Sequence, residues 1–381
     1  MLKKLTIKNY KSIYEITIDL GRTNVFIGEN GCGKTNILEA LAMAGASRAL
    51  DLNIEGLYNR GIRVARPNLT FSSFTKLKQN NKISINLEYQ EKNKKIVIPS
   101  ILYCDDPYDI YSKWKDEHPI FLIDEDELHL HPKWQKKLCK EYNNLIKNEH
   151  VKQYRDLANY LIYNPEIKSL RGIYSESKKS PLGIHGEGLD ILLSKFSTQE
   201  WDILQSYNYM ISWLEDIVID KKDALKFKGH KLGKSHSLLY FKDKFMLKKD
   251  MSNIFSAENA NDGVLHILFY LSLFISNKTP SFFAIDNIEA SLNPRICRTI
   301  IKELTKLAKI NNKQALFTTH NPAVLDGINL NDDDQRLFVV CRNDEGKTQV
   351  KRIKLKPKSD EKLKLSEMWM RGYLGGLPKN F

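Results

Sequence analysis

The stretch Gly28-Glu29-Asn30-Gly31-Cys32-Gly33-Lys34-Thr35 decides the fold of this chain of 381 residues, because it matches G-x-x-x-x-G-K-[ST] at every fixed position. In such a loop, glycines let backbone N–H groups wrap phosphates, the lysine reaches the β- and γ-phosphates, and the hydroxyl ligates Mg²⁺ at a helix N-terminus. We therefore expect ATP and Mg²⁺ to bind here, with Thr35 on the metal. The expected nucleotide contacts are Gly28, Asn30, Gly31, Cys32, Gly33, Lys34, Thr35 and Asn36.

The sequence around this loop has the strand, loop and helix order that the motif requires. Asn24 to Ile27 form a short apolar run before the loop, and Asn36 to Met43 have helical spacing after it. Leu2 to Leu20 are typical of two strands around a polar bend at Lys11 and Ser12. Alternating apolar residues between 68 and 100 predict an antiparallel meander beside this core.

Strands alternate with helices again from residue 255 onward. This alternation predicts a parallel sheet with right-handed crossovers. The expected elements are a helix at Gly263 to Phe274, a strand at Phe282 to Ile285, a helix at Arg295 to Ile310 and a strand at Ala315 to Thr319.

Polar residues at the ends of these elements are suited to complete a nucleotide site. Asp286 ends an apolar strand and would hold Mg²⁺ through water, opposite Thr35. His320 ends the next strand, where it would sense the γ-phosphate. Asn261 and Gly263 open a helix whose N-terminal amides would bind a second anion. Each position alone is a weak signal, but their order and spacing favour one shared site.

Taken together, these motifs resemble the head domain of the ABC-type ATPases of the SMC, RecF and OLD group, over residues 1–45 and 259–325. The resemblance implies a P-loop NTPase fold in which two heads sandwich two ATP molecules, so we expect a homodimer or a higher homo-oligomer. Each signature motif would then cap the nucleotide on the opposite P-loop. In order, the similar segments are Gly28 to Thr35 (Walker A), Asn261 to Gly263 (signature), Asp286 (Walker B), Ser291 to Pro294 (D-loop) and Thr318 to Pro322 (switch histidine).

More narrowly, the short chain, the lack of long coiled-coil arms and the run Asp286-Asn287-Ile288-Glu289 resemble the ATPase subunits of bacterial anti-phage systems such as Septu and PARIS. In those systems an ATPase of this type scaffolds a separate nuclease. The resemblance therefore implies an effector nuclease subunit as a partner.

Two residues depart from the pattern of the group. Asn287 follows the Walker B aspartate, where a catalytic glutamate usually polarises the attacking water, and an asparagine cannot accept the proton. Slow hydrolysis is therefore expected, with Glu289 as a substitute carboxylate. Asn261 stands in place of the signature serine and can still donate a hydrogen bond to a γ-phosphate. The expected catalytic group is therefore Asp286, Asn287, Glu289 and His320.

A second Walker B-like run spans Asp124 to His131 and is followed by Pro132. Three interpretations stay open: a duplicated segment without a catalytic role, the true Walker B, or a metal or partner site that uses Asp124, Glu125, His129 and His131. Position favours Asp286 for Mg²⁺, because no signature-like helix start precedes this run and no switch histidine follows it.

The chain divides by pattern into three parts. Residues 1–104 form the first part of the ATPase head with its antiparallel β subdomain, and residues 251–381 form the second part with a C-terminal tail. Residues 105–250 read as a mainly helical insertion, with helices at 133–145 and 201–217. The expected fold is therefore an α/β P-loop NTPase with a mixed sheet.

Composition limits the function classes. A formal charge of +13 and a pI near 9.2 fit a polyanionic partner such as DNA, but also a merely solvated basic surface. The densest basic segment is 221–236, and Arg60, Arg63 and Arg66 form a smaller cluster. Five scattered cysteines, no signal-peptide core and no membrane-length apolar run indicate a cytoplasmic protein without membrane contact.

Three functions compete on this reading. The leading hypothesis is an ATP-controlled dimerising switch that scaffolds an effector nuclease. The alternative is an autonomous, DNA-stimulated ATPase of recombination and repair, whose basic segment 221–236 would grip DNA. The third, least favoured, is a nuclease with its metal at Asp124 to His131.

Overall fold

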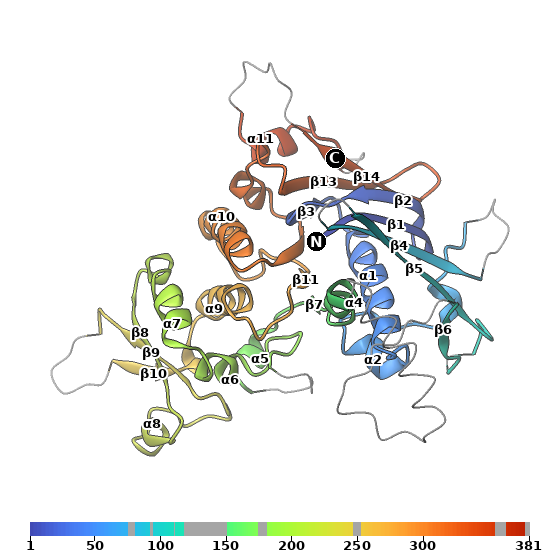
Figure 1. Ribbon diagram of the computed structural model, residues 1–381. Helices are drawn as coiled ribbons and strands as arrows, with labels where there is room; N and C mark the ends of the chain where they lie inside the picture. Colours follow the sequence, from blue (N-terminus) through green and yellow to red (C-terminus); the bar gives the residue numbers. More distant parts are fainter. Residues whose placement is uncertain are drawn as a thin grey trace, which may run out of the picture.

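The computed structural model describes residues 1–74, 81–91, 94–109, 111–117, 151–173, 181–246, 253–354 and 363–377. Its strands form three sheets, of six, five and three strands. Figure 1 shows the six-stranded sheet running through the middle, with helix α1 between it and the five-stranded sheet. The three-stranded sheet lies in a separate lobe at the other side.

The six-stranded sheet has the order β14-β13-β3-β12-β11-β7. The four pairings from β13 to β7 are parallel, and β14 pairs antiparallel with β13. Every residue of β3, β11 and β12 is buried, which explains their continuous apolar runs. The strands are β3 Thr23–Ile27, β7 Ile162–Tyr163, β11 Phe282–Ile285, β12 Gln314–Thr319, β13 Gln335–Arg342 and β14 Thr348–Ile353.

The five-stranded sheet is antiparallel, with the order β2-β1-β4-β5-β6. Between it and the central sheet lies α1 (Lys34–Arg48), in which every residue but Thr35 is buried. A helix that is apolar on all sides fits only a position between two layers. Helix α4 (Val151–Ala158) also packs on α1. The short helix α2 (Ile54–Tyr58) comes directly after α1 in the chain. The strands are β1 Leu2–Tyr10, β2 Ile13–Asp19, β4 Ile83–Glu91, β5 Lys94–Cys104 and β6 Trp114–Asp116.

On the other face of the central sheet, α9 (Asp262–Ile275) is the core helix, and residues 264–275 are all buried. Helix α10 (Pro294–Ile310) and three helices of the lobe pack against α9. The lobe elements are α5 Ile167–Leu170, α6 Leu189–Ser194, α7 Thr198–Gln205, β8 Leu214–Ile219, α8 Ala224–Phe227, β9 Leu239–Asp243 and β10 Ile254–Ser256. Among the described residues, 3₁₀ helices connect these parts at η1 Pro67–Leu69, η3 Asn208–Met210, η4 Ala257–Asn259 and η5 Pro322–Gly327.

The predicted fold class is confirmed: an α/β fold with a mixed central sheet and an antiparallel sheet beside it. The helices and strands expected between residues 263 and 319 occur as α9, β11, α10 and β12, and each end lies within one residue of its expected position. The strongest sequence patterns therefore placed the elements that surround the nucleotide loop.

The expected mainly helical insertion at 105–250 differs from the structure. Strand β6 extends the antiparallel sheet, and β7 pairs with β11 in the central sheet, so part of this range belongs to the two sheets of the flanking segments. The helix expected at 201–217 ends at Gln205 and gives way to strand β8, whose Ile217, Val218 and Ile219 favour extended backbone. The helix expected at 133–145 lies outside the described residues.

The C-terminal segment forms α11 (Leu365–Met370), which packs on the same subunit. Trp369 and Leu374 are buried in the main core cluster. A Cβ on Gly376 would lie 2.4 Å from Val339 of β13, so the glycine permits a close approach to the central sheet.

Candidate functional site

The loop from β3 to α1 has the geometry of a phosphate-binding turn. Gly33, the N-cap of α1, has φ of 108°, a conformation that side chains rarely adopt. A Cβ on Gly28 would lie 2.1 Å from the carbonyl oxygen of Val340, so only glycine lets β13 approach the loop this closely. Both glycines of the pattern are therefore required by the backbone itself, and the N-terminal N–H groups of α1 face the end of the loop.

Lys34 is buried within this loop. Its Nζ donates to the carbonyl oxygens of Gly28 and Glu29, each at 2.9 Å, and lies 3.3 Å from Nδ1 of His320. Burial lowers the pKa of Lys34 from its ordinary value, and the nearby carboxylates of Asp286 and Glu289 oppose that shift. The P-loop lysine and the histidine that follows β12 thus lie next to each other.

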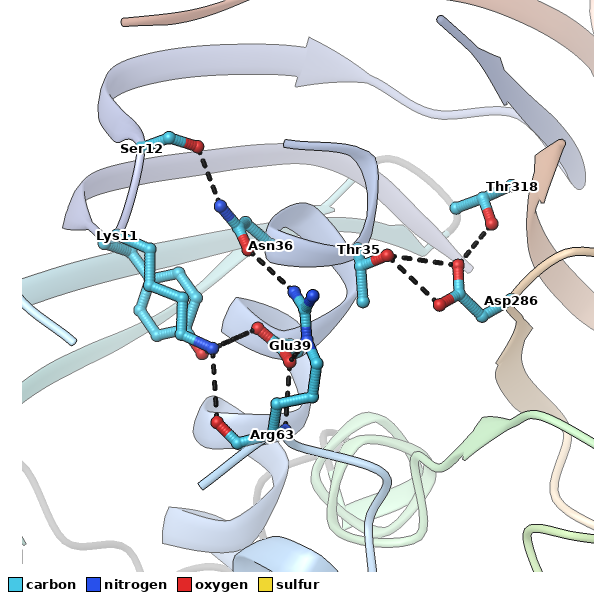
Figure 2. Close-up of polar contacts among 9 residues, drawn as sticks. Lys11, Ser12, Thr35, Asn36, Glu39, Arg63, Asp286 and Thr318 are labelled. Atoms are coloured by element: carbon cyan, nitrogen blue, oxygen red, sulfur yellow. Dashed lines mark hydrogen bonds and ion pairs between the residues drawn. The ribbon is translucent and has the colours of Figure 1, made fainter. Parts of the chain in front are cut away.

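Thr35 and Asp286 lie side by side (Figure 2). The Thr35 hydroxyl is 3.1 and 3.2 Å from the two carboxylate oxygens of Asp286, which also accepts a hydrogen bond from Thr318 Oγ1. The parallel pairing of β11 with β12 puts Asp286 beside Thr318 at the same sheet edge. A hydroxyl and a carboxylate are the hard oxygen donors that Mg²⁺ prefers, so the pair fits the metal expected here.

The segment after Asp286 turns sharply. Asn287 has φ of 55°, which asparagine tolerates better than most residues, and its N–H donates to Thr318 Oγ1 at 2.9 Å. Glu289 accepts a hydrogen bond from the His320 N–H at 2.7 Å, and its second carboxylate oxygen is buried without a hydrogen-bond partner among the described residues. Burial, followed by the charge of Lys34, lowers the pKa of His320. Glu289 therefore stands next to the Lys34–His320 pair.

The expected signature residues lie elsewhere. Asn261 is the N-cap of α9 and accepts from the N–H of Val264 at 2.9 Å. A Cβ on Gly263 would lie 3.4 Å from the carbonyl oxygen of Ser291, so this helix start adjoins the D-loop-like segment. In the part of the chain that the structure describes, no hydrogen bond joins Asn261 or Gly263 to residues 28–35. The chain thus brings Asp286, Asn287, Glu289 and His320 to its own P-loop, but not Asn261 and Gly263.

A polar network on α1 was not foreseen from the sequence. The Glu39 carboxylate is fully buried and accepts from Lys11 Nζ, from Arg63 Nε at 2.8 Å and from the Arg63 N–H at 3.0 Å. The Arg63 guanidinium also donates to Asn36 Oδ1 at 3.0 Å, one residue beyond Thr35 (Figure 2). The one usable signal was a lone carboxylate inside the apolar run Ile37-Leu38-Glu39-Ala40-Leu41.

The three arginines near residue 63 do not form one cluster. Arg60 is buried and donates to the carbonyl oxygens of Ala158 and Tyr160, at 2.7 and 3.1 Å, and burial lowers its pKa to about 10. Arg66 is exposed. Of the three arginines, only Arg63 reaches the first turns of α1, where its guanidinium forms an ion pair with Glu39. The larger basic segment is likewise mixed: Lys231 is buried against Ser237, whereas Lys222, Lys226, Lys228 and Lys234 are exposed.

Two further findings concern metals and membranes. No group of three or more potential metal ligands from His, Cys, Asp and Glu occurs among the described residues, and the run Asp124 to His131 lies outside them. Across those same ranges, no helix combines the length and the apolar character that a membrane crossing requires.

Two protein-family models match this chain. Residues 1–119 match the family described as "AAA ATPase domain", and residues 143–326 match the family described as "AAA domain, putative AbiEii toxin, Type IV TA system". The two matches together contain the P-loop and Asp286, Asn287, Glu289 and His320. Both matched segments are therefore similar to AAA-type ATPase domains.

The fold is similar to that of SMC heads. An SMC head bound to the C-winged helix domain of ScpA aligns with a TM-score of 0.51 and 14% identity, covering 93% of this chain and 98% of that one. An SMC head with an extended coiled coil, derived from Pyrococcus furiosus and bound to the C-terminal domain of ScpA, aligns with a TM-score of 0.50 and 12% identity, covering 93% and 96%. The SMC head from Thermotoga maritima aligns with a TM-score of 0.49 and 15% identity, covering 93% and 99%.

Proposed function

We propose that the protein is a nucleotide-controlled switch: Mg²⁺–ATP on the P-loop joins two copies, and slow hydrolysis sets how long they stay joined. Lys34 and the N–H groups at the start of α1 bind the phosphates, and Thr35 with Asp286 holds the metal. Arg63, anchored by Glu39 and Asn36, adds an exposed guanidinium beside these groups. The site thus supplies phosphate donors, metal ligands and a charge-neutralising arginine.

Completion of the site by a second copy follows from the position of the signature residues. Asn261 and Gly263 lie at the start of α9, beside Ser291, and contribute no hydrogen bond to their own P-loop within the described residues. The N-terminal N–H groups of α9 are suited to an anion. In a head-to-head dimer each α9 would cap the nucleotide bound to the opposite chain.

The main support for the proposed switch is the asparagine at position 287, directly after Asp286. An amide there cannot take a proton from the attacking water. Glu289 is the substitute: one oxygen is held by the His320 N–H, and the other is buried without a partner among the described residues. A carboxylate two residues beyond the usual position should support only slow hydrolysis, so the two copies would stay joined for longer.

For the biological setting, we propose an ATPase subunit that scaffolds an effector nuclease in anti-phage defence. The match to the family described with an AbiEii toxin and a type IV TA system supports a setting of this kind. The alternative function, a DNA-stimulated ATPase of recombination and repair, is favoured by the exposed lysines Lys222, Lys226, Lys228 and Lys234.

A mixing experiment tests the shared site. Lys34→Ala disables the P-loop, and Gly263→Asp puts a repelling carboxylate at the α9 N-terminus, where the fold has room for a Cβ. Each variant alone should lack turnover, whereas an equimolar mixture regains part of it, because one composite site pairs the intact P-loop with the intact α9. A mixture as inactive as its components would refute completion in trans.

Two further measurements separate the candidate functions. The first is light scattering after gel filtration of the Glu289→Gln variant. This variant should form dimers with Mg²⁺–ATP and remain monomeric with ADP. Turnover should change by less than about 2-fold when duplex DNA is added. Strong stimulation that disappears with Lys226→Glu/Lys228→Glu would favour the DNA-stimulated ATPase instead.

A further inference from the structure

A groove of about 590 Å³ runs along α10 and is separate from the nucleotide site. Its second wall is formed by η5, the following loop and the first residue of β13, and the two walls meet where a Cβ on Gly327 would lie 2.5 Å from the carbonyl oxygen of Arg298. The positively charged lining residues are Arg295, Arg298, Lys302, Lys306 and Lys309.

These five side chains form one continuous face of the helix. Their spacing of three or four residues repeats the helical turn, and the row is about 21 Å long at the rise of an α-helix. All five residues are exposed. Lys306 pairs with Glu303 at 2.8 Å, but among the described residues the other four side chains form no ion pair or hydrogen bond.

This arrangement works against the stability of the helix. Like charges three and four residues apart repel each other, and Arg295 and Arg298 lie at the N-terminal end, where the helix dipole disfavours cations. The first turn of α10 contains no acidic residue to compensate. An anionic partner would remove both penalties, so the row is better explained by binding than by folding.

The lining favours an acidic peptide over a nucleic acid. Single-stranded nucleic acids are bound on rows of aromatic rings, and none of the described residues that line this groove is aromatic. The opposite wall also carries Asp326 and Asp332, which would repel an unbroken row of phosphates. These two carboxylates accept hydrogen bonds from Ser366 and Gln335, so they are fixed in place. A peptide can present its N–H groups to that wall and its carboxylates to α10.

We propose that the α10 groove binds an acidic, Asp- and Glu-rich segment of a partner protein. The arginines Arg295 and Arg298 form two-pronged pairs with carboxylates, and the lysines supply point charges further along. Peptide binding here goes beyond the nucleotide-controlled switch and does not depend on ATP hydrolysis.

Fluorescence anisotropy with the full chain tests this groove. The probes are a fluorescein-labelled peptide of repeating Asp-Glu-Ser units, its neutral Asn-Gln-Ser analogue, and labelled single-stranded and duplex DNA. The groove variant is Arg298→Glu/Lys302→Glu. The matched control is Lys226→Glu/Lys228→Glu, which changes the net charge equally at exposed lysines of the lobe.

The acidic peptide should bind the wild-type chain, and its affinity should fall by about 10-fold or more in the groove variant but by less than about 2-fold in the control. The melting temperature of the groove variant should not fall, because the substitutions relieve like-charge repulsion. Binding of the neutral analogue at equal strength, equal loss in both variants, or loss of DNA binding with no peptide binding would overturn the proposal.

Discussion

Replacing Glu39 with glutamine should destabilise the protein by about 3 kcal/mol. The Glu39 carboxylate has no exposed surface and neutralises two cations at once, Lys11 and Arg63. Breaking a buried ion pair costs about 3–5 kcal/mol, because the remaining charges lose their partner. The lower end of that range applies here, since the Arg63 side chain is 65% exposed and water can take over part of its solvation.

This free energy can be converted into a melting temperature. An unfolding entropy of about 2.1 cal/mol/K per residue gives about 0.8 kcal/mol/K for this chain, so Glu39→Gln should lower the melting temperature by about 4 °C. The matched control is Glu15→Gln, whose carboxylate pairs with Lys8 at 2.8 Å but on the surface, with half of its side chain exposed. Exposed pairs contribute about 0.2–1 kcal/mol, so the control should shift by about 1 °C or less.

Differential scanning fluorimetry of the two variants measures the difference, and urea titration gives the free energies. The double variant Glu39→Gln/Arg63→Gln should be less unstable than the sum of its single variants, because the two residues share one interaction. If Glu39→Gln melts within about 1 °C of Glu15→Gln, the network on α1 does not stabilise the fold, and the anchoring of Arg63 fails with it.

The remaining predictions concern the nucleotide site. Lys34→Ala should weaken the binding of a fluorescent ATP analogue by about 10-fold or more, since it removes a charge-assisted bond to phosphate; unchanged affinity would contradict its role. Asp286→Ala should abolish Mg²⁺-dependent turnover while Glu125→Gln leaves it intact, and the opposite pattern would make the earlier run the true Walker B. Asn287→Glu should raise turnover by about 10-fold in a coupled assay, although its positive φ makes a glutamate strained there. Because the pKa of His320 is lowered by burial, the unfolded state binds its proton more readily, and the free energy of unfolding falls as the pH drops below about 6.5. His320→Gln should make that fall shallower in denaturant titrations, whereas an unchanged slope would show that His320 does not contribute.

The sequence alone identified the positions at which the backbone conformation requires one particular residue type. Gly28 and Gly33 are required by a close approach and by a positive φ, and both appear as fixed positions of the motif. The apolar patterns of β11 and β12 predicted the positions of Asp286 and His320, because in a parallel sheet the residues that follow neighbouring buried strands lie at the same edge. These positions follow from local pattern and sheet geometry.

The contacts that the sequence did not predict join distant segments. Glu39 and Arg63 are 24 residues apart, and nothing in the spacing of a buried helix and a loop arginine indicates that they pair. Thr318 donates a hydrogen bond to Asp286 from 32 positions away, and a threonine inside a buried strand does not by itself indicate this contact. Strand β7 was also missed, because two residues are too few to show a period.

Helix α1 links the nucleotide site to both sheets through four side chains near its start. Lys34 contacts His320 after β12, Thr35 contacts Asp286 after β11, and Asn36 and Glu39 hold the turn between β1 and β2 together with Arg63. Phosphates bound at the N-terminus of α1 would therefore act on segments that the chain brings from both of its ends. Nucleotide binding should therefore stabilise the two sheets as one unit rather than the loop alone.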